Sequence, residues 1–234
     1  MVNRLVAGLK ACATHCVTHG VILTSLVSFG CRGAQPDDVL GRAAFEGRTP
    51  DVLAQLERGE GSPCHALVWA ARGGWPAPIL AITARGVNPN ACHEGVHGWT
   101  PLMHAIHKSQ RAAVQALIGA GVNVNAAAPH AFTPLMMAVG NGDLPIVRML
   151  LAAGADPRAT TPNGTSVIGI AISGGAFTDI ERPLLGACRL DVVRELVAAG
   201  APDPELQPTF RWIVARTIAR LNGCEEALRL IDRR

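Results

Sequence analysis

Apolar residues recur along the chain at the spacing of amphipathic helices. In three segments they are placed so that they share one helix face. These segments contain Val114, Leu117 and Ile118; Ile146, Val147, Leu150 and Leu151; and Val192, Val193, Leu196 and Val197. A glycine follows each segment, at Gly121, Gly154 and Gly200, and glycine readily adopts the left-handed conformation that ends a helix. The pattern therefore predicts a series of helices whose apolar faces form a continuous core.

A short motif precedes two of these helices and repeats after 33 residues. The two copies are Thr100-Pro101-Leu102-Met103-His104-Ala105 and Thr133-Pro134-Leu135-Met136-Met137-Ala138. In each copy the threonine hydroxyl can cap a helix, and proline suits the first helical position because its missing N–H needs no partner there. Gly121 and Gly154 are separated by the same interval. A fixed period of this length indicates a stack of two-helix units.

These motifs resemble the ankyrin repeat, whose pattern combines T-P-L-x-x-A with a later A-G-A-D. The resemblance covers roughly residues 38–234. It implies an all-α repeat solenoid of stacked helix-turn-helix units with short β-hairpin turns and a long concave face. Met103 and Met136 depart from the family pattern, since they stand where the family commonly has a histidine that ties adjacent hairpins together.

The period also predicts how the chain is divided. We expect a signal or anchor segment at 1–31, a linker at 32–37 and a repeat domain at 38–234. The repeat domain comprises an N-terminal cap (38–61), repeats at 62–97, 98–130, 131–163 and 164–203, and a C-terminal cap (204–234). Gly154 and Gly200 are 46 residues apart, which places 13 additional residues near 174–187. Connections of this length are often functional, and we expect the apolar side chains of this one to fold back onto the repeats.

The first 31 residues differ from the rest in charge and hydropathy. No acidic residue occurs before Asp37, Arg4 and Lys10 come early, and an apolar run occupies 21–30. That run is too short to cross a membrane and is typical of the apolar region of a secretory signal peptide.

The apolar run ends at Cys31, which resembles the lipid-carrying cysteine of bacterial lipoproteins. Ser28 and Phe29 depart from the usual lipobox of that family. We expect a bacterial protein that is exported to the periplasm or anchored in the envelope through Cys31. A cytoplasmic protein with a disordered N-terminus is the alternative.

Composition favours a protein partner over nucleic acid. Hydrophobic residues make up 49% of the chain and aromatic residues 4%, which suits closely packed helices. The net charge is only +3, from 21 basic and 18 acidic residues, and no basic stripe stands out. The chain lacks the H-E-x-x-H, G-x-x-x-x-G-K, C-x-x-C and G-x-S-x-G motifs. We therefore expect no enzyme activity, no bound metal and no cofactor.

The resemblance implies that the protein binds another protein, and it indicates where. Partners of ankyrin proteins usually contact the hairpin tips and the exposed side of the first helices. The corresponding residues are His97, Trp99, His107, Lys108, His130, Phe132 and Asn141, joined by Arg72, Trp75, Asn163 and Thr165 in the flanking repeats. Trp99 and Phe132 are equivalent by the period, and aligned aromatic residues are typical of binding hot spots. Shielding of the hairpin bases is the alternative, and we expect a monomer.

Four cysteines of the repeat domain fall into two pairs, whose states the sequence leaves open. Cys64 and Cys92, with the nearby histidines, suit either a zinc site or a disulfide, although they lack the C-x-x-C spacing. Cys188 and Cys224 lie at turns of adjacent units, and the same alternatives apply.

Three other functions are weighed against a general binding module. One is a periplasmic immunity factor that neutralises a toxin. Another is an accessory protein in peroxide defence that binds haem or a metal through histidine and cysteine. The last is an enzyme whose site lies in the insertion, where Asp179, Glu181 and Arg182 offer the chemistry.

Overall fold

A computed structural model describes residue 36 and residues 38–93, 98–162, 164–173, 188–201 and 210–232 of the chain. The chain divides into two compact units, Met1–Ala34 and Gln35–Arg234, and the described residues all belong to the second unit. The signal segment with Cys31, the insertion at 174–187, His97 and Asn163 lie outside the described residues.

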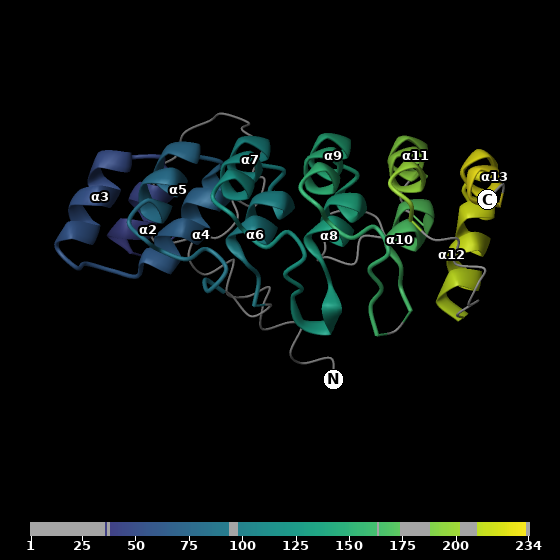
Figure 1. The fold of residues 1–234 in the computed structure, drawn as a ribbon, viewed down its shortest axis with the longest axis horizontal. Helices are drawn as coiled ribbons and strands as arrows, with labels where there is room; N and C mark the ends of the chain where they lie inside the picture. Colours follow the sequence, from purple (N-terminus) through teal and green to yellow (C-terminus); the bar gives the residue numbers. More distant parts are fainter. Residues whose placement is uncertain are drawn as a thin grey trace, which may run out of the picture. The chain divides into compact units, whose positions relative to one another are not determined.

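The helices of the second unit form two layers (Figure 1). The first layer contains α2 (Val39–Phe45), α4 (Pro63–Gly73), α6 (Pro101–His107), α8 (Pro134–Asn141), α10 (Val167–Ser173) and α12 (Phe210–Leu221). The second layer contains α3 (Thr49–Glu57), α5 (Pro76–Thr83), α7 (Arg111–Gly119), α9 (Leu144–Ala152), α11 (Leu190–Ala198) and α13 (Glu225–Asp232). Every helix packs against its neighbours in its own layer and against its partner in the other layer. The predicted all-α repeat solenoid is confirmed.

The helix starts follow the predicted chemistry. The Thr100 hydroxyl accepts a hydrogen bond from the Met103 N–H at 3.3 Å, and Thr133 accepts one from Met136 at 3.2 Å. Each cap satisfies one of the N–H groups that a helix start leaves without a helical partner. Ser62 caps α4 in the same way, which shows that the less regular first repeat uses the same device.

The core runs through both layers of the stack. The predicted core residues Val114, Leu117, Ile146, Val147 and Leu150 are fully buried. Burial of one such side chain stabilises the fold by roughly 1.5–3 kcal/mol. Met103 and Met136, which replace the usual histidines, are also fully buried, so apolar packing takes the place of a polar tie between hairpins at these positions.

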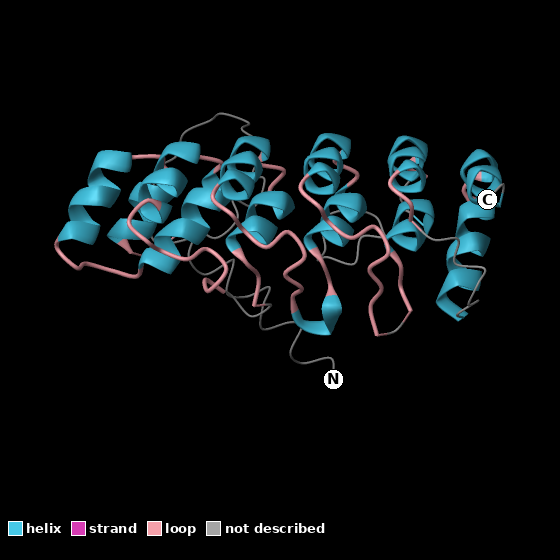
Figure 2. Ribbon diagram, in the orientation of Figure 1, coloured by secondary structure: helices cyan, strands magenta, loops and turns pink. Residues whose placement is uncertain are grey.

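The connections between repeats are loops that project beyond the helices, and the loop between α7 and α8 contains a short 3-10 helix, η2 (Pro129–Ala131) (Figure 2). The Ala128 N–H donates to the Phe132 carbonyl at 2.9 Å, and the Thr161 N–H donates to the Thr165 carbonyl at 2.9 Å. Both pairings accompany isolated β-bridges, and the described residues contain no extended strand. The hairpins therefore hold their shape by a few backbone bonds and by packing on the helices.

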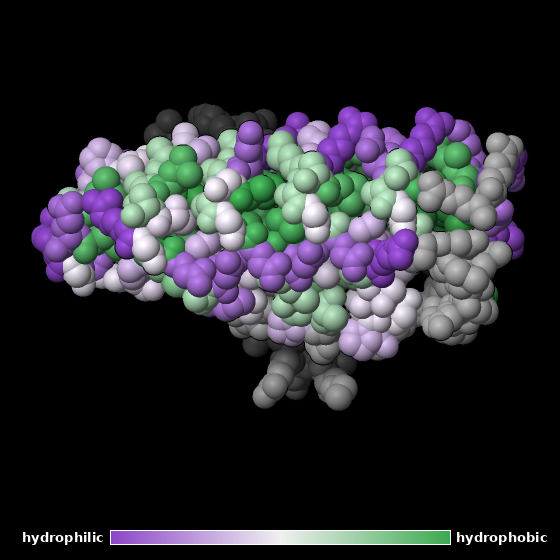
Figure 3. Space-filling view, in the orientation of Figure 1, coloured by the Kyte–Doolittle hydropathy of each residue, from purple (hydrophilic) through white to green (hydrophobic). Residues whose placement is uncertain are grey.

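Side-chain amides join the loops that follow the second-layer helices. Asn90 and Asn125 occupy equivalent places, and each reaches the loop of the next repeat with both ends of its amide. The bonds are Asn90 Nδ2 to the Gly121 carbonyl (3.3 Å), Asn123 N to Asn90 Oδ1 (2.6 Å), Asn125 Nδ2 to the Gly154 carbonyl (3.0 Å) and Asp156 N to Asn125 Oδ1 (2.8 Å). On the face of the molecule shown in Figure 3, a band of hydrophilic side chains runs along the stack.

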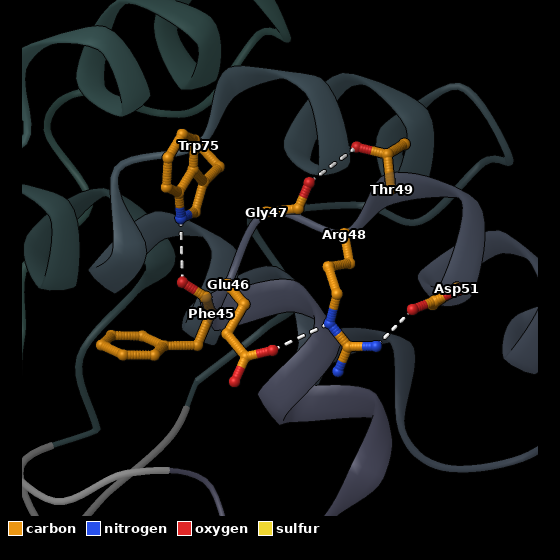
Figure 4. Close-up of polar contacts among 7 residues, drawn as sticks. All are labelled: Phe45, Glu46, Gly47, Arg48, Thr49, Asp51 and Trp75. Carbon is orange, nitrogen blue, oxygen red and sulfur yellow. Dashed lines mark hydrogen bonds and ion pairs between the residues drawn. The ribbon is translucent and has the colours of Figure 1, made fainter.

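The turn between α2 and α3 requires a glycine. Gly47 has a φ of +77°, and a Cβ added there would lie 2.6 Å from the ring of Trp75. Trp75 comes from the next repeat, and its Nε1–H donates to the Phe45 carbonyl at 2.9 Å (Figure 4). Gly74 and Ser109 take the equivalent positions after α4 and α6. Ser109 has a φ of 54°, which is a strained conformation for a residue with a side chain.

Candidate protein-binding surface

Aromatic and basic side chains gather on the first-layer helices α2, α4 and α6 and on the hairpin before α6. Repeat register places Arg72 of α4 and His107 of α6 in equivalent positions, and likewise Trp69 and His104. We call this surface the first-helix face and define it by Phe45, His65, Trp69, Arg72, Trp99, His104, His107 and Lys108.

Trp69 is the centre of the first part of this face. The residue is 9% exposed, and its ring forms an edge-to-face pair with the Phe45 ring, with 5.7 Å between centroids. Its Nε1–H donates to His65 Nε2 at 2.8 Å. The Cζ atom of Arg72 lies 4.6 Å from the centroid of the Trp69 ring. The indole therefore fixes an arginine by a cation–π contact.

Arg72 differs from most arginines of the structure in its surroundings. Its Nε atom is buried without a hydrogen-bond partner, and burial lowers the pKa of its guanidinium. It forms no ion pair with a described carboxylate. Eight other arginines do so, namely Arg48, Arg58, Arg85, Arg111, Arg148, Arg194, Arg216 and Arg229. Arg72 is thus a partly desolvated cation whose charge is not neutralised by the described part of the chain.

Trp99 is the centre of the second part of the face. Its ring centroid lies 5.5 Å from that of His104 and 5.1 Å from that of His107. His104 is buried and His107 is half-buried, whereas Lys108 at the end of α6 is exposed. The structure therefore brings together two of the predicted binding residues, Trp99 and His107, beside His104, which the sequence did not single out, and it leaves Lys108 exposed at the next position.

Other predicted binding residues have structural contacts. The amide of Asn141 donates through Nδ2 to the Ile106 carbonyl at 2.9 Å, which links α8 to α6. Phe132 is half-buried and packs against the core, and Thr165 is buried. The side chain of His130 lies outside the described residues. A shared surface for Trp99 and Phe132 stays a prediction.

Both cysteine pairs form disulfides. Cys64 and Cys92 are bonded with their Cα atoms 5.1 Å apart, and Cys188 and Cys224 with theirs 5.6 Å apart. A disulfide sulfur has no thiolate to offer a metal, so these pairs are not zinc ligands in this state. Among the residues that the structure describes, no group of three or more His, Cys, Asp or Glu side chains could hold a metal ion.

Comparison with protein families matches residues 67–161 to the family model for ankyrin repeats, in three copies. This segment consists of ankyrin repeats. A search of curated proteins finds no match to the chain. The ankyrin segment begins within α4 and runs through α9, and it includes Trp69, Arg72, Trp99 and His107 of the first-helix face.

Ankyrin repeats are generally modules of protein–protein interaction and are typically not enzymes. Within the described part of the chain, no helix has the length and apolar character needed to cross a membrane.

Reasoning from the sequence did not assign Phe45, His65, Trp69 or His104 to a binding surface, and considered His65 only as a metal ligand. A signal was present for Trp69, because Trp69 and Arg72 precede His104 and His107 by the same 35 residues. Aligning the less regular first repeat with the second, including the two additional residues of its hairpin, would have placed them on this face.

Proposed function

We propose that this protein binds a partner protein through its first-helix face and the adjoining hairpin tips. The observation that supports the proposal is the row of aromatic and basic side chains on α2, α4 and α6, in a chain that carries ankyrin repeats. Contacts with neighbouring rings hold Trp69, Arg72 and Trp99 in place. Side chains that are fixed before binding lose little conformational entropy on association.

We also propose that the protein acts outside the cytoplasm, in the periplasm or attached to the envelope through Cys31. Two observations support this location. The sequence of residues 1–31 is typical of a signal segment, and all four cysteines that follow Ala34 are paired in disulfides. Disulfides persist in oxidising compartments. An immunity factor for a toxin is one form of this proposal, in which the partner is the toxin.

Site-specific photo-crosslinking tests the binding proposal. The photoreactive residue p-benzoylphenylalanine replaces Lys108, which is exposed on the first-helix face, in the full chain expressed in cells that naturally produce it. The matched control carries it at Gln115, which is exposed on α7 in the second layer of the same repeat. We expect a discrete protein adduct from position 108 and none from position 115. Equal labelling at both positions, or no adduct at 108, would contradict the assigned surface.

A further inference from the structure

The charge on the first-helix face departs from that of the surrounding protein. Arg4, Lys10 and Arg32 precede Gln35, so Gln35–Arg234 carries 18 basic and 18 acidic residues and has no net charge. On the face itself, Arg72 and Lys108 form no ion pair with a described carboxylate. The local excess of positive charge is therefore a property of this surface and not of the whole unit.

Two carboxylates at the ends of α2, Glu46 and Asp38, are engaged with other groups. Glu46, which occupies the position in α2 equivalent to Lys108 in α6, pairs with Arg48 at 2.8 Å. Asp38 accepts a hydrogen bond from the Gly41 N–H through Oδ1, and its Oδ2 lies 3.3 Å from His65 Nε2. Neither carboxylate forms an ion pair with Arg72, so the described chain leaves that positive charge for another molecule.

The surroundings of Arg72 suit a carboxylate. Contact with the Trp69 ring holds one planar face of the guanidinium, which directs the N–H groups along its edges. A carboxylate accepts two parallel hydrogen bonds from such an edge, and a charge-assisted pair of this kind is stronger than a neutral hydrogen bond. Partial desolvation strengthens the attraction further, because less water screens it.

The equivalent positions further along the stack lack this chemistry. In α8, Met137 takes the place of Trp69 and His104, Gly140 takes the place of Arg72 and His107, and Asn141 that of Lys108. Asn141 is already bonded to the Ile106 carbonyl. Toward the C-terminus the basic side chains at these positions therefore end at α6, while on the other side α2 carries the exposed Arg42.

We infer that the first-helix face recognises an acidic segment of a partner protein, in which an Asp or Glu side chain binds Arg72 and an adjoining apolar residue packs on Trp99. This inference rests on the proposed function and names the chemistry of the partner. Lys108 adds a second, exposed positive charge, which accelerates the encounter with an acidic segment more than it strengthens the final complex.

Selection of peptides on the full chain tests the inference. The probe is a phage-displayed library of random dodecapeptides, selected against the oxidised protein. We expect the enriched peptides to place Asp or Glu next to an apolar residue. The best peptide should lose affinity by at least about tenfold in the Arg72→Gln variant, as expected for a charge-assisted hydrogen-bonded pair. A second peptide carries the matching amide in place of the acidic residue. It should bind the wild type with a similar loss of affinity, whereas the Arg72→Gln variant should bind the two peptides with nearly equal affinity.

The matched control is Arg220→Gln. Arg220 is exposed at the end of α12 and forms no ion pair with a described carboxylate, so this variant removes the same charge at a distant site and should bind the peptide as the wild type does. Arg72→Lys keeps the charge but not the planar edge, and should recover part of the affinity. Circular dichroism and urea midpoints show whether Arg72→Gln still folds.

The outcomes separate this inference from the proposed function. Enrichment of neutral or basic peptides would contradict the inference of an acidic partner, and so would equal affinities of Arg72→Gln and Arg220→Gln for the best peptide. In either case a crosslink from position 108 would still support protein binding. If no peptide is enriched and position 108 also yields no adduct, the inference and the proposed function fail together.

Discussion

Gly47 shows how one residue ties two repeats together. Its left-handed conformation ends α2, and its bare Cα lets the Trp75 ring of the next repeat approach closely (Figure 4). We predict that Gly47→Ala lowers the free energy of unfolding by about 2 kcal/mol, since the methyl group adds a steric clash to the cost of a left-handed backbone. Urea denaturation followed by circular dichroism measures this change.

Gly59 provides the matched control. Its φ is +71°, close to that of Gly47, but no heavy atom lies within 4 Å of an added Cβ. Gly59→Ala therefore meets only the backbone cost, about 1 kcal/mol. Equal losses in the two variants would mean that the Trp75 ring moves away freely and does not hold the repeats together.

Predictions for single residues succeed where the local backbone determines which side chain is needed, as at a helix start. Thr100 and Thr133 cap their helices as expected because the need for a cap is local. Asn141 shows what the sequence leaves hidden. Its contact with a partner stays a prediction, and its amide also bonds to the Ile106 carbonyl of the previous repeat; a single sequence does not reveal which distant carbonyl lies within reach.

At the level of elements, the loops contribute to the coupling between repeats. Asn125 forms two hydrogen bonds to the next loop, to the Gly154 carbonyl and from the Asp156 N–H. We predict that Asn125→Ala destabilises the protein by about 1–2 kcal/mol, because two bonds between neighbouring units are lost. The urea midpoint should fall, and the transition should broaden if the units lose part of their coupling.

Asn123→Ala is the control for this effect. The Asn123 side chain accepts from the Asn125 N–H within its own loop, so its removal weakens a turn and leaves the bonds of Asn125 to the next loop intact. We expect a loss of about 0.5 kcal/mol. A larger loss in Asn123→Ala than in Asn125→Ala would show that the local turn, and not the bond between loops, stabilises this edge.

Helices were easier to predict than the contacts between loops. The apolar periodicity of α7, α9 and α11 and the T-P-L motifs of α6 and α8 follow from rules that act within a few residues. The bonds of Asn90 and Asn125 join residues about one repeat apart. Their signal is the recurrence of a polar residue at one register position, which becomes clear only after the repeats have been aligned.

For the whole unit, the sequence predicted the type of stack but left the state of the cysteines open. Periodicity determines that like units pack side by side, which is enough to predict an all-α solenoid. The cysteine pairs could not be assigned because the spacing of Cys64 and Cys92 excluded neither a zinc site nor a disulfide. Proximity in the folded chain, with Cα atoms 5.1 Å apart, selects the disulfide.

The two disulfides lie toward opposite ends of the stack, and each closes a loop of chain. Cys64–Cys92 spans 28 residues and joins the start of α4 to the loop before α6, and Cys188–Cys224 spans 36 residues and joins the start of α11 to the turn before α13. Loops of this length give roughly 3–4 kcal/mol of stabilisation per disulfide in the chain-entropy treatment. We predict that Cys64→Ala/Cys92→Ala and Cys188→Ala/Cys224→Ala each lower the urea midpoint, and that dithiothreitol destabilises the wild type more than either variant.

Trapping of thiols in living cells connects this stability to the location of the protein. Cells are quenched with acid, the chain is unfolded, and a maleimide reagent of known mass labels the thiols that remain free. A protein that works in an oxidising compartment should show no free thiol at Cys64, Cys92, Cys188 or Cys224. Reduction before labelling should expose all four thiols and serves as the positive control. Free thiols at these positions in untreated cells would contradict the proposed export, and they would mean that the working protein lacks the stabilisation that the two disulfides provide.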